Sequence, residues 1–216
     1  GRAITTVGAP SIVTSPRLLG ARSISFDGVD DYLSIADSDD WHFGSGDFSV
    51  EVFWRCTTPP PTSGFIYCLA GQYEYGSAQR SWRIGLTFDV TRYRLFGAVS
   101  YTGSAASLMV QNDYGLPTAS YNHLFNGQTN YAALIRKGTS LKLRATAVYA
   151  DAYQEVTASI GSNALFNSTA PLTIGANLSG GAGVGFFPGQ IDEVRITKGV
   201  ARPAGSWAPA KKFARS

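Results

Sequence analysis

The segment around residue 50 alternates between apolar and polar side chains. One face of this segment is apolar, and the other carries Ser49, Glu51 and Arg55, with Phe53 as the exception. A period of two is the pattern of a β-strand, because successive side chains of a strand point to opposite faces of the sheet. We therefore predict a long strand with Trp54 buried in the core, and Phe53 indicates that the second face is also covered in part. The apolar face consists of Phe48, Val50, Val52, Trp54 and Cys56.

Further strand-like runs follow along the chain, separated by turns rich in Gly, Asn and Asp. Many short strands without helical periodicity are typical of an all-β sandwich or barrel. Only residues 165–167 suggest a short helix. The remaining predicted strands are residues 65–70, 81–89, 92–100, 107–111, 130–136, 140–148, 172–176 and 190–197.

The length of 216 residues fits one sandwich domain, which we place at residues 22–204. Residues 1–21 are small and polar and contain two prolines, so we expect an arm, tether or edge segment there. Residues 205–216 are expected to form a C-terminal arm. This arm carries Trp207 and Phe213, and exposed apolar rings commonly mark interfaces. The two rings are candidate interface residues of an oligomer or docked subunit, and the alternative is that they fold back over the sandwich edge.

Three segments of the sequence resemble motifs of a known family. Residues 23–35 read SISFDGVDDYLSI, residues 43–54 read FGSGDFSVEVFW, and residues 187–203 read FPGQIDEVRITKGVARP. Together they resemble the core strands of a laminin G-like domain of the concanavalin A-like superfamily. The hairpin at residues 131–143 adds to this resemblance, although residues 144–149 replace the tight second turn of the family. The resemblance implies a jelly-roll-like β-sandwich of two antiparallel sheets.

The last of these segments is similar to copies of the domain in tailed-phage and other virion proteins. This resemblance implies a non-catalytic virion structural or adhesion module, such as a head fibre, capsid decoration or tail-fibre domain. Such a module would bind other virion proteins, host surface glycans or both. The alternative is a carbohydrate-binding or adhesion module of a secreted bacterial protein, which would be extracellular.

Catalytic residues are not evident. Related glucanases carry Glu-x-Asp-x-x-Glu on one strand, where two carboxylates act on the glycosidic bond. The nearest match here has Gln190 and Arg195 in place of the two glutamates. The two histidines, His42 and His123, lie in no nucleophile motif, and no Cys/His spacing indicates zinc. We expect no enzymatic activity.

Calcium is a candidate ligand, because it takes six to eight oxygens from carboxylates, carbonyls and water. Asp27, Asp30 and Asp31 flank a glycine turn, and residues 37–40 (DSDD) are a second candidate ligand set or a solvated turn. The resemblance adds Asp192, since an Asp near the last strand often helps to bind a structural calcium in related domains. Asp192 could instead cap a turn or pair with an arginine.

Glycan binding would use exposed aromatic rings flanked by polar groups. The densest aromatic loop spans residues 73–82, and Tyr114 lies in a later turn. Any single ring is also a candidate for the core. The candidate glycan-binding residues are Tyr73, Tyr75, Trp82 and Tyr114.

Charge is unevenly distributed along the chain. Residues 23–54 contain no Lys or Arg and hold more than half of the 15 acidic residues. Such a field can orient docking, although Asp also prefers turns for local reasons. The basic C-terminal end lacks the interleaved aromatics of nucleic-acid-binding segments, so we expect no nucleic acid partner. No apolar run approaches the ~18 residues of a membrane span.

The chain has two cysteines, Cys56 and Cys68, on strands joined by a proline-rich loop. Paired strands would bring the thiols together in a disulfide, which would indicate an oxidising location. Two buried free thiols are the equal alternative, because a free cysteine behaves as a small apolar residue.

Overall fold

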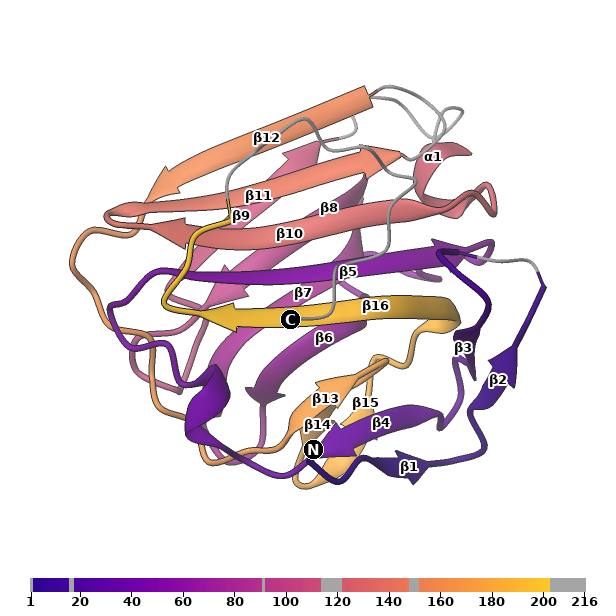
Figure 1. The fold of residues 1–216 in the computed structure, drawn as a ribbon, viewed down its shortest axis with the longest axis horizontal. Coiled ribbons are helices and arrows are strands. Elements are labelled where there is room, and N and C mark those ends of the chain that lie inside the picture. The colour runs from indigo at the N-terminus through magenta and orange to yellow at the C-terminus, as the bar shows by residue number, and fades with distance from the viewer. Residues whose placement is uncertain (1, 16–17, 91, 114–121, 148–151, 203–216) are drawn as a thin grey trace.

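The computed structural model describes residues 2–15, 18–90, 92–113, 122–147 and 152–202. Its strands form two sheets that pack face to face (Figure 1). Apart from one short parallel pairing between β14 and β6, every strand pairing among these residues is antiparallel. In spatial order, the first sheet consists of β1 (Thr5–Val7), β4 (Tyr32–Ile35), β13 (Leu172–Ile174), β6 (Ile66–Glu74), β7 (Gln79–Asp89), β8 (Arg92–Val99) and β9 (Leu108–Asp113), and the pair β14 (Asn177–Ser179) and β15 (Ala182–Val184) joins it at β6.

The second sheet has β5 and β16 at its centre. Helical structure among the described residues is confined to a 3-10 turn, Asp39–Trp41, and to α1, Asn122–Phe125. The jelly-roll-like, all-β prediction is therefore confirmed. In spatial order, the second sheet consists of β12 (Ala152–Ser159), β11 (Ser140–Ala147), β10 (Asn130–Lys137), β5 (Phe48–Cys56), β16 (Pro188–Lys198), β3 (Ser23–Asp27) and β2 (Ser11–Val13).

The main core lies between the sheets and contains the apolar face of β5. Trp54 has no exposed surface, as its place in the alternating pattern predicted. Phe53 points to the other face of the same strand and is equally buried. It packs on Tyr131 of β10 with ring centroids 5.0 Å apart. Both faces of β5 are therefore covered. Phe53, the exception in the polar face, belongs to a second buried apolar cluster with Leu19, Tyr131, Ala133 and Ile135.

The predicted strands all appear, with small shifts at their ends. The sequence patterns missed β12 and the pair β14 and β15. The helix suggested at residues 165–167 is wrong. Instead, the amide of Leu165 donates to the carbonyl of Gly44, and the amide of Phe166 donates to the carbonyl of Ser100. Hydrogen bonds to two distant segments replace the local bonds that a helix would need.

The N-terminal segment contributes one edge strand to each sheet. β1 pairs with β4 in the first sheet, and β2 pairs with β3 in the second. The edge-segment alternative therefore describes residues 5–13. Trp207 and Phe213 lie outside the described residues, and their role as interface residues stays a prediction.

Both cysteines are buried and unbonded. Burial raises the pKa of the Cys56 thiol to about 11 and that of the Cys68 thiol to about 12. Both thiols are therefore protonated and act as small apolar groups. Within the described residues, no helix has the length and apolar character needed to cross a membrane.

Candidate functional site

The outer face of the first sheet carries arginine and aromatic side chains in place of a simple polar surface. Strand register puts Arg83 of β7 beside Gly71 of β6, and Phe96 of β8 beside Gly85 of β7. Gln111 of β9 pairs with Phe96 and therefore shares its face. The opposite phase of the same strands, including Trp82 of β7, points into the core.

Two glycines make room for these large side chains. A Cβ atom on Gly85 would lie 3.0 Å from the ring of Phe96 and 2.5 Å from the carbonyl oxygen of Tyr67. A Cβ atom on Gly71 would lie 2.7 Å from the Cβ of Arg83. Glycine allows a close approach that no other residue permits. The ring and the arginine can therefore lie close against the sheet.

Arg83 is the centre of an aromatic cage. Its guanidinium carbon lies 4.1 Å from the ring centroid of Tyr73, 5.2 Å from that of Tyr75 and 5.1 Å from that of Phe96. The guanidinium also donates a hydrogen bond to the Tyr75 hydroxyl. Attraction between a cation and ring faces is strongest where water is excluded, and Arg83 is only 4% exposed. The cage holds Tyr75 at the sheet surface.

Arg80 lies on the solvent side of this cage. Its guanidinium carbon is 5.1 Å from the Tyr75 ring, and it donates hydrogen bonds to the backbone carbonyls of Tyr75 and Ser104. The half-buried Tyr75 is thus fixed by two arginines. Its ring is an oriented surface feature rather than a mobile loop side chain.

The structure separates the four predicted glycan-binding aromatics. Trp82 is fully buried, and its indole nitrogen donates to the carbonyl of Trp41 at 3.3 Å. Tyr73 is 2% exposed, and burial raises the pKa of its hydroxyl. Neither ring offers a face for stacking, so the structure contradicts the expectation for these two. Tyr75 keeps that role as a candidate, and Tyr114 lies outside the described residues.

A groove of about 290 Å³ continues from the cage along the same face. The Arg94 guanidinium spans it, 3.0 Å from the Asp89 carboxylate, and donates to the Gln111 side-chain carbonyl at 3.2 Å. The Gln111 amide nitrogen keeps its donors for a ligand, since no described residue accepts from it. This outer-face groove is lined by Ser63, Gly64, Ile66, Thr87, Phe88, Asp89, Arg94, Phe96, Met109 and Gln111.

Sequence reasoning missed the outer-face groove. The sequence pattern that could have revealed it consists of Arg83 and Arg94 on the polar faces of predicted strands, together with Gly71 and Gly85. Charged residues on the polar face of a predicted strand are ordinarily expected to be exposed to solvent. Only the register of β6 to β9 shows that these residues share one face with Phe96.

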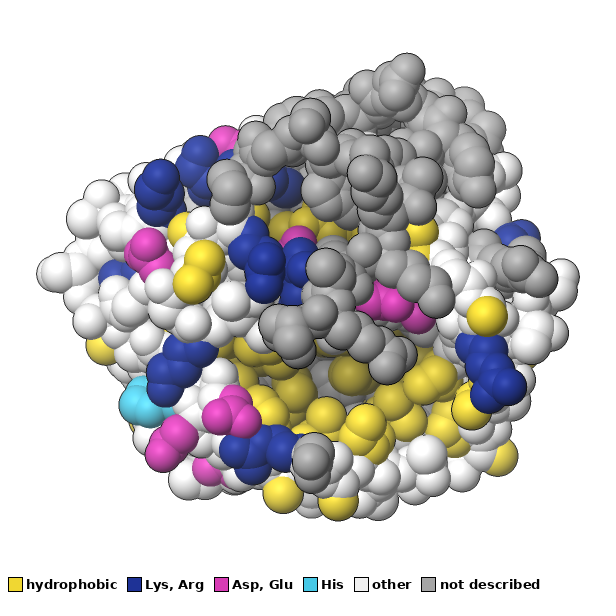
Figure 2. Space-filling model, in the orientation of Figure 1, with side chains coloured by type: hydrophobic (Ala, Val, Ile, Leu, Met, Phe, Trp, Pro, Cys, Tyr) yellow, Lys and Arg dark blue, Asp and Glu magenta, His cyan; other side chains and the backbone are white. Residues whose placement is uncertain are grey.

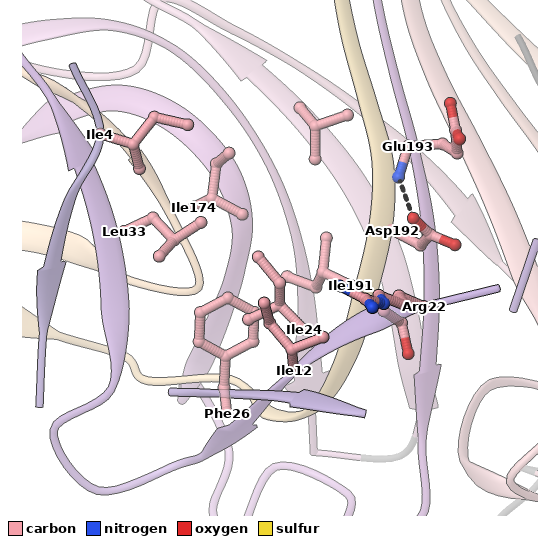
Figure 3. A pocket seen from close by; sticks show the side chains of 12 residues that line it. Ile4, Ile12, Arg22, Ile24, Phe26, Leu33, Ile174, Ile191, Asp192 and Glu193 are labelled. Atoms are coloured by element: carbon pink, nitrogen blue, oxygen red, sulfur yellow. Dashed lines mark hydrogen bonds between the residues drawn. The ribbon is translucent and has the colours of Figure 1, made fainter. Parts of the chain in front are cut away.

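A second groove, of about 280 Å³, opens between the two sheets at the N-terminal edge. In Figure 2 its apolar side chains form a hollow below β16, and Figure 3 shows how they converge. Asp192 and Glu193 lie at its polar end (Figure 3). This N-terminal groove is lined by Ile4, Ile12, Arg22, Ser23, Ile24, Phe26, Leu33, Ile174, Ile191, Asp192, Glu193 and Val194.

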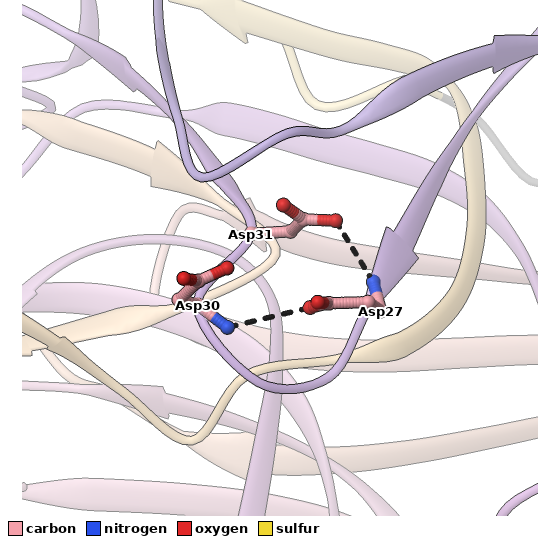
Figure 4. Close-up of side chains that lie close together, drawn as sticks. All are labelled: Asp27, Asp30 and Asp31. Carbon is pink, nitrogen blue, oxygen red and sulfur yellow. Dashed lines mark hydrogen bonds between the residues drawn. The ribbon is translucent and has the colours of Figure 1, made fainter.

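The predicted calcium ligands divide between two places. Asp27, Asp30 and Asp31 bring carboxylate oxygens within 4.8 Å of one another in the turn between β3 and β4 (Figure 4). Asp192 lies elsewhere, because Asp27 is paired with Pro188 and Asp192 lies four residues further along β16. Four residues along a strand correspond to about 13 Å. The structure therefore brings the three carboxylates of the turn together, as expected, and leaves Asp192 apart from them.

The carboxylates of this turn already accept backbone hydrogen bonds. Asp31 accepts from the amides of Ala9 and Asp27, at 2.6 and 3.0 Å. Asp27 accepts from the amides of Val29 and Asp30. The bond from Val29 is the main cause of the lowered pKa of Asp27. Asp30, whose carboxylate accepts no such bond from a described residue, has the most capacity left for a cation.

The segment nearest to the glucanase motif, residues 190–195, uses the side chains of Asp192 and Arg195 in hydrogen bonds and an ion pair within the protein. Asp192 accepts hydrogen bonds from the amides of Leu19 and Glu193, at 3.1 and 2.9 Å. Glu193 has a φ of +48° at the irregularity where the register of β16 against β5 shifts. Both carboxylates thus belong to a bulge of β16, and Arg195 pairs with Glu51 at 2.6 Å.

Solved structures with this fold include several binding domains. The binding domain of botulinum neurotoxin serotype G has a TM-score of 0.65 at 10% identity, over 94% of this chain and 44% of that chain. The enzymatically active domain of bacteriophage CBA120 tailspike protein 2 has a TM-score of 0.64 at 13% identity, over 90% and 28%. The LG1-3 region of the laminin α2 chain has a TM-score of 0.51 at 14% identity, over 81% and 30%.

These likenesses concern the fold, since each identity is below 15% and the chain spans less than half of each of these structures. No curated protein matches the sequence. The family comparison is more specific, and it matches the Laminin G type of the concanavalin A-like lectin/glucanases superfamily over residues 27–204. The match covers both sheets and most of their strands. The chain belongs to this laminin G-like family of the concanavalin A-like lectin/glucanases superfamily.

Proposed function

We propose that this domain is a non-catalytic carbohydrate-binding or adhesion module, and that the outer-face groove is its glycan site. The observation that carries the proposal is the groove itself, where the Arg94–Asp89 ion pair and Gln111 lie beside the exposed Met109 and the half-buried Phe88. Sugar hydroxyls need donors and acceptors fixed close together, and the apolar face of a sugar ring packs on apolar side chains. Binding sites typically combine a few oriented polar groups with apolar walls.

The charge of this face favours acidic sugars. The strands around the groove, β6 to β9, carry four arginines, at positions 80, 83, 92 and 94, and three acids, at positions 74, 89 and 113, so their net charge is +1. Arg83 is too deeply buried to touch a ligand, and its contact with the groove is through the ring of Phe96, 5.1 Å from its guanidinium carbon. A positive field raises the local concentration of anionic ligands. A glycan that carries carboxylate or sulfate groups is therefore the proposed ligand class.

A glycan array with neutral, sialylated, uronic and sulfated members tests this proposal. Arg94→Gln should weaken binding of the best acidic glycan by about tenfold, since one charge-assisted hydrogen bond contributes on the order of 1.5–3 kcal/mol. Arg2→Gln is the matched control, because Arg2 is an exposed arginine paired with Asp40, away from this groove. Binding that is equal in both variants, or no binding of any glycan, would contradict the proposal.

Absence of catalysis is part of the proposal. It is supported by Gln190 and Arg195 at the positions where a glucanase would carry its two glutamates. The backbone bonds that hold the Asp192 carboxylate point the same way. Hydrolysis of a β-glucan that disappears in Asp192→Asn would overturn it.

We further propose that the module is part of a virion, and the alternative is an extracellular bacterial adhesin. The wording of residues 192–202 and the fold likeness to a tailspike domain support this location. The partners would then be other virion structural proteins in addition to host glycans. Mass spectrometry of purified particles tests the location, and absence of the chain from every particle fraction would favour the alternative.

Structural calcium at the turn of Asp27, Asp30 and Asp31 also belongs to the proposal. Three carboxylates supply the oxygen ligands that calcium prefers, although the backbone bonds to Asp27 and Asp31 leave Asp30 as the main donor. A melting temperature that rises in millimolar calcium but not in magnesium, and does so less in Asp30→Asn, would support it. Equal melting curves in calcium and in chelator would refute it.

A further inference from the structure

The N-terminal groove exposes part of the apolar interior at one edge of the sandwich. Its walls come from both sheets, with Phe26 and Ile191 from the second sheet and Leu33 and Ile174 from the first. Phe26, Leu33 and Ile191 also belong to the main core. The groove is therefore an opening into the core, and water in contact with its walls carries a free-energy cost.

Two exposed isoleucines stand at the rim of this opening. Ile4 is 58% exposed and Ile12 is 66% exposed, although both side chains line the groove. Ile12 belongs to β2, the outermost strand of the second sheet, and Ile4 precedes β1, the outermost strand of the first. Edge strands with exposed apolar side chains are ready sites of association. The same edge thus offers both a cavity and apolar projections.

Two charged side chains of opposite sign flank the groove without partners. Within the described residues, neither the Arg22 guanidinium nor the Glu193 carboxylate takes part in a hydrogen bond or ion pair. Glu193 is half-buried, and its φ of +48° lies in the region that favours glycine. Such a backbone conformation costs on the order of 1–3 kcal/mol and persists where the structure holds it in place. The bulge therefore presents a carboxylate at the mouth of the groove.

We infer that this edge is a two-fold interface with a second copy of the chain. A two-fold interface needs one surface that is complementary to itself, because the same patch serves both subunits. Here one patch holds an apolar opening, apolar projections that fit such an opening, and charges of both signs in Arg22 and Glu193. The third charged side chain of the lining, Asp192, accepts hydrogen bonds from the amides of Leu19 and Glu193. Ile12 enters the groove of the second copy, and Arg22 faces the partner's Glu193, with the reciprocal pair on the other side of the axis.

This charge pattern favours a second copy over other apolar occupants. An acyl chain or an apolar peptide would cover the isoleucines and leave both Arg22 and Glu193 unpaired. A burial of unpaired charge is costly, whereas the two-fold arrangement pairs each charge. The inference is independent of the proposed glycan site, since the outer-face groove lies on other strands.

Analytical ultracentrifugation of the full chain over a concentration series tests the inference. The wild type is expected to be a dimer, and Ile12→Asp should shift it to monomer at the same concentration. Val90→Asp is the matched control, because Val90 is 72% exposed in the turn between β7 and β8 and should leave the dimer intact. Circular dichroism melting of each variant confirms that it is folded.

A charge exchange makes the test specific to the two-fold arrangement. R22E alone and E193R alone should each weaken the dimer by at least tenfold, through repulsion between like charges. The double variant R22E/E193R should restore the dimer, because the pair is then reversed on both sides. A monomeric wild type, a dimer that survives Ile12→Asp, or a double variant no better than the single ones would each overturn the inference.

Glycan binding separates this test from that of the proposed function. A monomeric Ile12→Asp variant should keep its affinity for a monovalent glycan, since the outer-face groove is intact. Loss of dimerisation with retained glycan affinity is the expected result. Loss of dimerisation together with loss of glycan affinity in this variant would show that the two surfaces are coupled and not independent.

Discussion

The outer faces of the two sheets both bury a charged side chain, but they satisfy it differently. On the second sheet, Glu51 of β5 is almost fully buried and accepts a hydrogen bond from the Tyr131 hydroxyl at 2.8 Å. Its other oxygen pairs with Arg195 at 2.6 Å. On the first sheet, Arg83 has aromatic rings around it and no carboxylate within ion-pair distance among the described residues.

The difference separates a structural network from a site that can hold a ligand. In the Glu51 network, the carboxylate of Glu51 is bonded to both Tyr131 and Arg195, so its two oxygens have partners within the protein. Burial raises the pKa of Tyr131, with the Glu51 carboxylate adding to the shift, so the tyrosine stays a donor. The Arg83 cage holds one cation with ring faces, which leaves a net positive charge beside the outer-face groove. A face that keeps an uncompensated charge next to a cavity is a better candidate for recognition.

The largest effect is expected from the closed network. Glu51→Ala should lower the free energy of unfolding by about 3 kcal/mol, the lower end for a broken buried pair, because Arg195 keeps some access to water. Denaturant unfolding at pH 7 measures it. Asp40→Ala is the control, because the ion pair of Asp40 with Arg2 is exposed to solvent, and it should cost much less. Equal losses would mean that Glu51 is not the centre of a network.

The second effect is steric and belongs to the first sheet. Gly85→Ala should cost about 1–3 kcal/mol, because its Cβ would overlap the Tyr67 carbonyl oxygen and press on the Phe96 ring. Displacement of Phe96 should also weaken glycan binding. Gly46→Ala, where the nearest atom to a Cβ is 3.3 Å away, is the matched control. A stable Gly85→Ala protein with unchanged glycan affinity would contradict this account of the groove.

A smaller effect is expected from the cage itself. Arg83→Met keeps the apolar length of the side chain and removes its charge, so the loss should be about 1–2 kcal/mol from the buried cation–aromatic contacts. The exposed Arg2, 5.3 Å from the Trp41 ring, provides the comparison. Arg2→Met should cost about 0.5 kcal/mol. Thermal unfolding of both variants measures the difference, and a larger loss for Arg2 would reverse the comparison.

The smallest effect concerns an exposed carboxylate. The pKa of Asp27 is lowered in the folded state, so the charged form stabilises the fold above the usual pKa of an unfolded Asp, near 4. This contribution is lost as the pH falls through the lowered folded value. The melting temperatures of the wild type and Asp27→Ala should therefore differ at pH 6 and converge toward pH 2. A difference that stays constant with pH would exclude the carboxylate charge as the cause.

Much of the fold could be read from local patterns. The alternation of residues 48–56 predicted which face of β5 is buried, because side-chain direction in a strand depends only on position along it. The laminin G-like wording at both ends of the domain predicted the family. β14 and β15 are three residues long, too short for a period of two to stand out. They were missed for that reason.

The sites depended on contacts between distant segments. Tyr73, Tyr75 and Trp82 are equally plausible stacking residues when only the sequence is considered. In the structure, Trp82 lies on the core-facing side of β7, and Tyr73 is buried against Arg83. Asp27 and Asp192 lie on adjacent strands, yet the antiparallel register sets them four residues apart, so Asp192 does not join the carboxylates of the turn. Local patterns were sufficient to predict the longer strands, the buried face of β5 and the family. They could not predict which residues meet, because register and sheet packing depend on contacts between segments that are distant in the sequence.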